Sequence, residues 1–159
     1  MIIRCETGDS VEVATTSLEG ACLRGLNLHR ALLDGVNLSG ADIAGAQLRS
    51  SWLEGANLER ANLESANLAA VNATGSRFLQ ANLSGAMMRS GVFVRADFRN
   101  ATLLNAKVGM AQFKGANLCG ADMRCEGLAT ADFEGATYDQ DTIWPAEITP
   151  GSLAGLVRV

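Results

Sequence analysis

The residues that could support catalysis or bind a metal are few and scattered along the chain. The single histidine, His29, has no nucleophile beside it to activate. The cysteines share no metal-ligand spacing and form no C-x-x-C motif: Cys5, Cys22, Cys119 and Cys125. No serine–histidine–acid set, phosphate-binding loop or metal cluster can be assembled. The sequence therefore predicts a protein that is not an enzyme and that uses no metal and no cofactor.

Length, hydropathy and the first residues suggest where such a chain would work. Its 159 residues suit one domain, and its formal net charge is −4. No apolar run approaches the ~20 residues that span a bilayer. A signal peptide has an apolar stretch after a basic start, and the segment Met-Ile-Ile-Arg-Cys-Glu does not begin one. We therefore expect a cytoplasmic protein with reduced thiols and no membrane partner.

A five-residue repeat, which must position any functional side chain, runs from residue 16 to about residue 140. Its clearest stretch is 56–70, which reads ANLER, ANLES, ANLAA. We call the third residue of each five the centre; it is a large apolar residue everywhere except at Ala73. Every phenylalanine is a centre: Phe78, Phe93, Phe98, Phe113 and Phe133. Such a fixed period predicts a stack of repeats around one narrow core.

The period excludes both regular secondary structures. Residues five apart on an α-helix differ by roughly 140° in direction, which would scatter the centres around the axis. A straight strand would send successive centres to opposite faces. A short extended piece followed by a corner keeps alanine and centre inward together. Asn or Asp before the centre and glycine at the fifth position both suit such a corner.

These residues resemble the pentapeptide-repeat family, whose motif is Ala-(Asp/Asn)-Leu-x-x, and the resemblance covers 16–140. It implies an all-β fold: a right-handed, four-sided β-helix with one pentapeptide per side, which makes about six coils from the pentapeptides of 16–140. At the strand spacing of ~4.8 Å per coil, the rod would be about 30 Å long. We therefore expect an N-terminal capping strand or segment over 1–15, the β-helix over 16–140 and a C-terminal cap over 141–159.

The C-terminal segment carries a second set of apolar residues. Thr149 and Pro150 resemble a helix N-cap followed by proline, which predicts a short helix over 150–157. Its apolar residues would cover the last coil, and the alternative is a homodimer contact, because the resemblance implies that some family members pair through this end. The candidate residues for the cap or dimer contact are Trp144, Leu153, Leu156 and Val157.

Two sides of the expected rod carry unusual outward residues. One is a basic face without acidic residues, formed by His29, Arg30, Arg49, Arg89 and Lys107. It suits an acidic partner or nucleic acid, or is simply a solvated surface; it lacks the aromatics of a single-strand binder, so direct nucleic-acid binding is not expected. The other is a candidate partner interface formed by Leu32, Trp52, Val92 and Val94. Exposed apolar clusters mark interaction sites, although the N-terminal segment could cover part of this one.

Single positions also break the pattern of the core. Ala73 is small, and we expect Phe78 and Phe93, which flank it in sequence, to stack and fill the space. Glu126 falls on an inward alanine position, so we expect the backbone at 125–127 to loosen and let it reach solvent. Cys125 falls on an outward position in the same register.

Two functions fit these features. The first is a protein-interaction or regulatory scaffold that binds another protein. The second comes from the resemblance: some family members imitate duplex DNA, bind DNA gyrase and protect it from quinolones. Mimicry needs dense negative charge along the rod. Here the acidic residues gather at the two ends, and basic residues outnumber them between 60 and 125. The scaffold is therefore the first hypothesis and the mimic the second.

Overall fold

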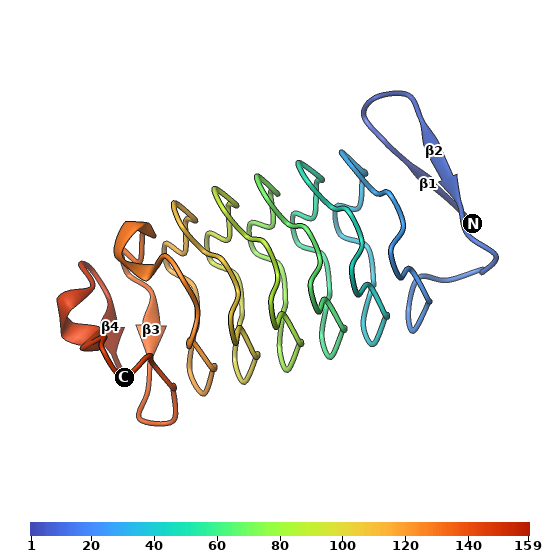
Figure 1. Cartoon of the computed structure of the whole chain (residues 1–159). Coiled ribbons are helices and arrows are strands. Elements are labelled where there is room, and N and C mark those ends of the chain that lie inside the picture. Colours follow the sequence, from blue (N-terminus) through green and yellow to red (C-terminus); the bar gives the residue numbers. More distant parts are fainter.

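A computed structural model describes residues 1–159 and shows a rod of stacked coils (Figure 1). Each side of a coil pairs with the next coil through an isolated parallel β-bridge, and partners such as Asn62 and Asn82 are 20 residues apart. The Leu58 N–H donates to the Arg77 carbonyl (2.7 Å), and the Arg77 N–H donates to the Ala56 carbonyl (2.9 Å). The chain is thus a β-helix with four short sides per coil. None of its helices is long and apolar enough to cross a membrane.

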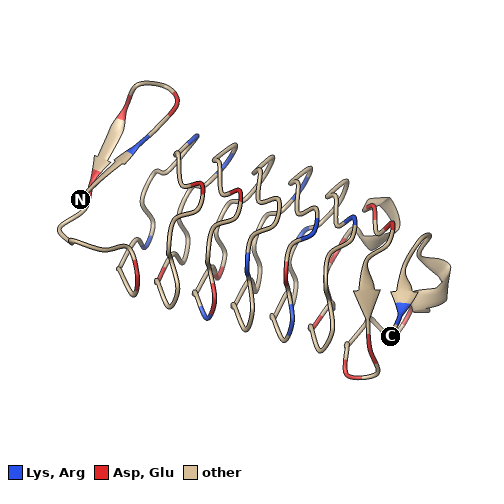
Figure 2. Ribbon diagram, turned by 180° about the vertical axis from the view of Figure 1, so that it is seen from behind, with Lys and Arg blue, Asp and Glu red and all other residues tan.

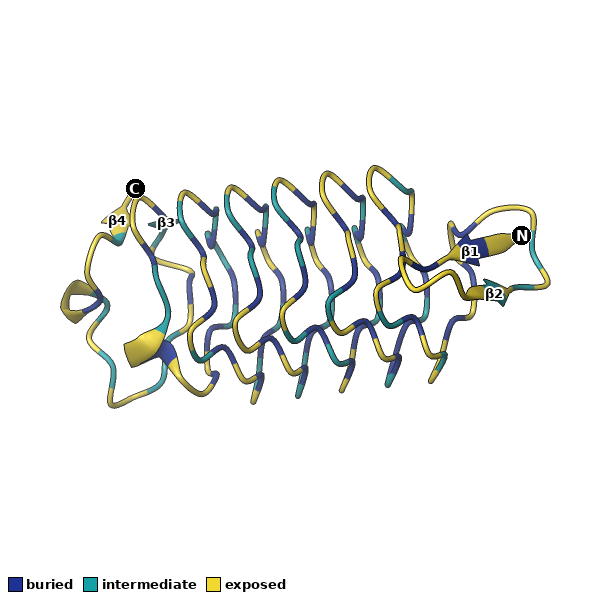
Figure 3. Ribbon diagram, turned by 90° about the horizontal axis from the view of Figure 1, so that it is seen from above, coloured by how far each residue is buried: buried dark blue, intermediate teal, exposed yellow.

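The repeat divides each side into inward and outward residues, as its sequence predicts. Ala56 and Leu58 are fully buried, and Figure 3 shows buried and exposed positions alternating along every coil. The Asn57 side-chain oxygen accepts the N–H of Glu59 (3.2 Å) and so closes the corner. The fifth residue is left-handed whether it is glycine or not: φ is 64° at Gly55 and 56° at Arg60. The corner geometry therefore belongs to the repeat and not to glycine alone.

A column of aromatic rings fills the C-terminal part of the core. Phe78 stacks on Phe98 with ring centroids 4.7 Å apart, and Phe93 stacks on Phe113 at 5.3 Å. The expected stacking of Phe78 with Phe93 is wrong, because these rings meet edge to face at 6.0 Å and 69°. Stacking requires residues on the same side of neighbouring coils, whereas these two lie on different sides.

A hairpin stands at the N-terminal end, made of β1 (Ile2–Arg4) and the antiparallel β2 (Ser10–Glu12). Its Ile3 side chain joins the core, and Val11 and Val13 pack against it. The Arg4 carbonyl accepts the N–H of Leu32 (2.8 Å), so the hairpin covers one side of the first coil. In Figure 1 the rest of the hairpin projects beyond the stack.

The C-terminal segment adds a strand where we expect a helix. β3 (Thr137–Tyr138) pairs in parallel with β4 (Val157–Arg158), and the helical part is only the 3₁₀ turn η2 (Pro150–Ser152). The predicted helix over 150–157 is therefore wrong. Gly155 has a φ of 78°, and a Cβ atom there would lie 2.7 Å from the Glu134 Cα. This close approach brings β4 into register with β3, which satisfies backbone groups that a helix would have used.

The coil is irregular around residue 126, where Lys107 pairs with Glu126 instead of residue 127. Glu126 is exposed, which confirms the expected loosening, and a 3₁₀ turn η1 (Leu128–Thr130) restores the register. Cys125 takes the inward place and is 8% exposed, so its outward assignment is wrong. Burial raises the pKa of the Cys125 thiol to about 12, which keeps it protonated and unreactive at neutral pH.

Candidate functional site

Leu32 and Trp52 lie side by side on neighbouring coils. They form a β-bridge pair at the position before the centre, where the repeat usually has Asn or Asp pointing outward. Leu32 is 47% exposed and Trp52 is 39% exposed. Val92 and Val94 belong to the same side but are less exposed, and Asn72 separates Val92 from Trp52. The structure thus narrows the apolar cluster to Leu32 and Trp52.

The N-terminal hairpin holds Trp52 in a fixed orientation. The Glu6 carboxylate accepts a hydrogen bond from the Trp52 indole N–H (3.4 Å) and pairs with the Arg30 guanidinium (2.8 Å). These bonds, that of Arg30 first, lower the pKa of Glu6. The hairpin therefore borders the indole without covering it, and the polar contact fixes where the apolar face of the ring points.

Two surface hollows border the cluster, one lined by Trp52 and the other by Leu32. On the Trp52 side a hollow of about 310 Å³ is lined by Glu6, Arg30, Ser51, Trp52 and Asn72 among others. On the hairpin side a hollow of about 220 Å³ is almost entirely apolar, and its lining includes Met1, Ile2, Leu18, Leu32 and Val36. Ile2 is 62% exposed, so apolar surface continues from the indole across Leu32 onto the hairpin.

The basic face is smaller than its sequence suggests. Arg30 is neutralised by Glu6, and the His29 Nδ1 lies 2.8 Å from the Arg49 carbonyl. Arg49, Arg89 and Lys107 remain exposed and take part in no ion pair. Only these three residues are available to an anionic partner.

Three of the four C-terminal candidates pack at the end of the core, and one lies on the surface. Trp144 meets the Phe133 ring at 6.4 Å and the Tyr138 ring at 5.7 Å, both edge to face. Leu153 is buried and Leu156 is half-buried, whereas Val157 is 46% exposed on β4. Trp144, Leu153 and Leu156 thus continue the core, and Val157 alone points into solvent.

The five-residue repeat also relates this chain to known proteins. The family model of pentapeptide repeats matches in 8 copies, over residues 16–46, 41–80 and 66–105. The chain belongs to the pentapeptide-repeat family. Its fold is accordingly the right-handed β-helix of that family. None of the curated proteins compared matches the chain.

Solved pentapeptide-repeat structures resemble this one closely in fold. HetL from the cyanobacterium Nostoc sp. strain PCC 7120, described as involved in regulating heterocyst differentiation, is 19% identical with a TM-score of 0.66; the match covers 89% of this chain and 74% of HetL. Rfr23 from the cyanobacterium Cyanothece 51142 is 24% identical with a TM-score of 0.59, over 79% and 89% of the two chains. The protein alr5209 from Nostoc PCC 7120 is 32% identical with a TM-score of 0.61, over 65% and 84%.

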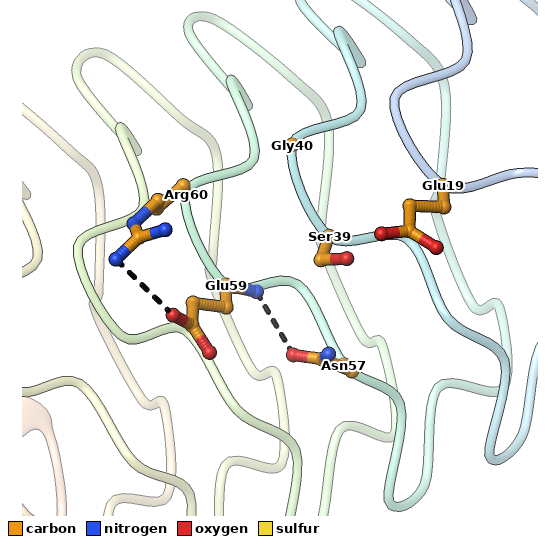
Figure 4. Close-up of a pocket in the computed structure, with 6 residues that line it drawn as sticks. All are labelled: Glu19, Ser39, Gly40, Asn57, Glu59 and Arg60. Atoms are coloured by element: carbon orange, nitrogen blue, oxygen red, sulfur yellow. Dashed lines mark hydrogen bonds and ion pairs between the residues drawn. The ribbon is translucent and has the colours of Figure 1, made fainter.

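A polar hollow of about 280 Å³ lies on another side of this pentapeptide-repeat protein and was not predicted (Figure 4). Its two carboxylates suggest acid–base chemistry, but both already have partners. Glu59 pairs with Arg77 (3.2 Å) and Arg60 (3.7 Å), and Glu19 accepts a hydrogen bond from the Asn37 side chain (3.1 Å). No group of three or more His, Cys, Asp or Glu side chains is placed to hold a metal ion.

Proposed function

We propose that this pentapeptide-repeat protein is a non-enzymatic binding module that docks another protein on the Leu32–Trp52 cluster. The proposal rests on one observation: two large apolar side chains lie exposed and adjacent where the repeat otherwise places polar ones. A tryptophan that the partner buries on binding is a frequent anchor of protein interfaces. The contact with Glu6 supports the same role, because an indole with a fixed orientation loses little conformational entropy on binding.

The test begins by identifying the partner. A photo-reactive amino acid at position 52 would cross-link whatever docks there in cells, and the isolated pair is then measured by calorimetry. We expect Trp52→Ala to weaken binding about tenfold or more, the loss typical of an interface anchor. Leu104→Ala, which removes a half-buried apolar residue from another side, is the matched control. Equal affinities of the Trp52→Ala variant and the parent protein would contradict the proposal.

DNA mimicry toward gyrase remains the alternative function. The net charge of −4 has the required sign, but several acidic residues along the rod are paired with arginine, as in Asp97 with Arg99 (2.7 Å) and Asp122 with Arg124 (2.6 Å). Figure 2 shows basic and acidic residues interspersed along the coils. A gyrase supercoiling assay with and without a quinolone decides between the two. Inhibition or protection at stoichiometric protein would favour the mimic, and no effect at large excess would exclude it for gyrase.

Homodimerisation through the C-terminal end is a separate proposal. Exposed apolar residues remain there, namely Ile143 (48%), Val157 (46%) and Val159 (69%). Light scattering coupled to gel filtration would measure the mass of the particle. A dimer that Val157→Asp converts into a monomer supports pairing at this end, whereas a monomer at high concentration argues against it.

A further inference from the structure

The cations of the rod divide into two classes. Most of them lie within ion-pair distance of a carboxylate: Arg24, Arg30, Arg60, Arg77, Arg99, Lys114 and Arg124. Four exposed cations of the rod have no such partner. Arg49, Arg89 and Lys107 share a single side of the β-helix, whereas Arg95 stands alone on another side. That side presents no acidic residue between 27 and 125. Positive charge therefore stays unbalanced here and nowhere else along the rod's sides to the same extent.

The backbone of this side also offers unused donors. In a regular coil the residue after the centre donates its N–H to the preceding asparagine, as Ala69 does to Asn67 (3.1 Å). Met87 and Lys107 replace that asparagine in two consecutive coils. As a result, the N–H groups of Arg89 and Gly109 have no hydrogen-bond acceptor within the protein.

These donors lie at a hollow of about 320 Å³ whose lining includes Arg89, Lys107, Gly109, Glu126 and Thr130. Gly109 keeps the hollow open, because it has no side chain at a position where other coils carry one. Glu126 contributes one negative charge against the two positive charges of Arg89 and Lys107. Free backbone N–H groups beside cationic side chains are a common way for proteins to bind an anion.

We propose that this hollow binds the carboxylate or phosphoryl group of an acidic polypeptide segment that lies along the rod from Lys107 to Arg49. The two residues are three coils apart, about 14 Å at the spacing of paired strands, which an extended segment of about four or five residues would cover. A polypeptide fits better than nucleic acid, because the positive stretch ends at Glu126 on one side and at the Glu6–Arg30 pair on the other. A longer polyanion would meet these carboxylates, and this side exposes no aromatic residue for base stacking.

The direct test is titration of fluorescein-labelled hexaglutamate at low salt, followed by fluorescence anisotropy. We expect the Arg89→Gln/Lys107→Gln variant to bind at least about tenfold more weakly, since hydrogen bonds to charged groups are the stronger ones. The matched control is Arg60→Gln/Arg124→Gln, which removes the same charge from paired cations on other sides and should change affinity by less than about twofold. Equal losses in the two variants would show attraction by net charge alone and would overturn the proposal.

A charge-neutral variant tests the backbone donors separately. Met87→Asn restores the asparagine of the repeat, which would take up the Arg89 N–H and lower affinity roughly two- to fivefold, as expected for one hydrogen bond. Unchanged binding by this variant would remove the backbone N–H from the site.

Two competing probes identify the ligand. A phosphoserine peptide that displaces hexaglutamate supports the phosphoryl form, and one that fails to do so supports the carboxylate form. Oligothymidylate that binds more tightly through the same residues would replace the polypeptide with nucleic acid, and no binding of any probe at low salt would refute the site. Trp52→Ala should leave these affinities unchanged, so the two binding proposals fail independently.

Discussion

The coils before and after residue 70 follow one repeat but fill their cores differently. Up to Leu68 the centres are leucine, with Ile43 as the one exception, whereas phenylalanine recurs from Phe78 onward. The bridges remain 20 residues apart through most of both halves, so the coil does not widen to accept the rings. A fixed cross-section therefore requires that a ring be matched by a smaller neighbour.

Two residues provide that space. Ala73 is the small centre directly below Phe93 on the same side, and both are fully buried. Gly91 replaces the inward alanine, and a Cβ atom there would lie 2.6 Å from Cε2 of Phe93. The aromatic half is thus a set of mutually dependent residues, while the leucine half repeats one interchangeable unit.

The largest expected effect is the loss of a stacked ring. Phe98 and Leu58 are both fully buried centres on the same side, but Phe98 also meets the Phe78, Phe93 and Phe113 rings. We expect Phe98→Ala to lower the free energy of unfolding by about 4 kcal/mol and Leu58→Ala by about 3 kcal/mol. Urea denaturation followed by circular dichroism measures both. An equal or larger loss at Leu58 would show that the rings add nothing beyond their volume.

The next effect tests the matching of Gly91 to Phe93. Gly91→Ala should lower the free energy of unfolding by about 1–3 kcal/mol, because the column holds the ring in place. Gly109→Ala is the control, since its Cβ would meet only the Thr130 hydroxyl at 3.5 Å. Phe93→Leu should cancel much of the Gly91→Ala loss in the double variant. Additive losses would mean that the two residues are not coupled.

A smaller effect is expected at the corners where the two halves meet. Ala70 has a φ of 54°, a left-handed conformation that costs alanine roughly 1–2 kcal/mol, part of which the greater unfolded-state freedom of glycine offsets. Ala70→Gly should therefore raise the free energy of unfolding by about 0.5 kcal/mol, measured by thermal unfolding. The next corner is Gly75, with a φ of 67°, and Gly75→Ala should have the opposite sign. Destabilisation by Ala70→Gly would place the cost of the corner elsewhere.

The smallest effect distinguishes the two tryptophans by pH. Because hydrogen bonds lower the pKa of Glu6, its contacts with Arg30 and Trp52 stabilise the fold above the unfolded pKa of about 4.3 and are lost as pH falls through the lower folded value. Trp52 fluorescence, recorded in a Trp144→Phe background, should change in that acid range. The fluorescence of Trp144, which packs on the Phe133 and Tyr138 rings, should not change in that range in a Trp52→Phe background. Glu6→Gln should abolish the transition at Trp52.

Most of the architecture is predictable from local pattern. The period of five assigns inward alanine and centre, outward asparagine and a left-handed corner, because each pentapeptide makes the same turn regardless of its distant neighbours. The candidate residues Leu32 and Trp52 were found in this way, as apolar residues on outward positions. The C-terminal end was harder to predict from local pattern. Gly155 packs against the Glu134 backbone, and that contact replaces a predicted helix with β4.

The sequence by itself determined the repeat, the narrow core and the inward or outward direction of the side chains in the regular coils, because these follow from a short local period. Only the tertiary structure decided which charges are free, since the carboxylate that neutralises Arg30 comes from Glu6 in the hairpin and not from the repeat. It also brought the unpaired N–H groups of Arg89 and Gly109, which lie on successive coils, to the lining of one hollow. Both depend on which residues stack across coils, and such contacts between distant segments set the surface chemistry.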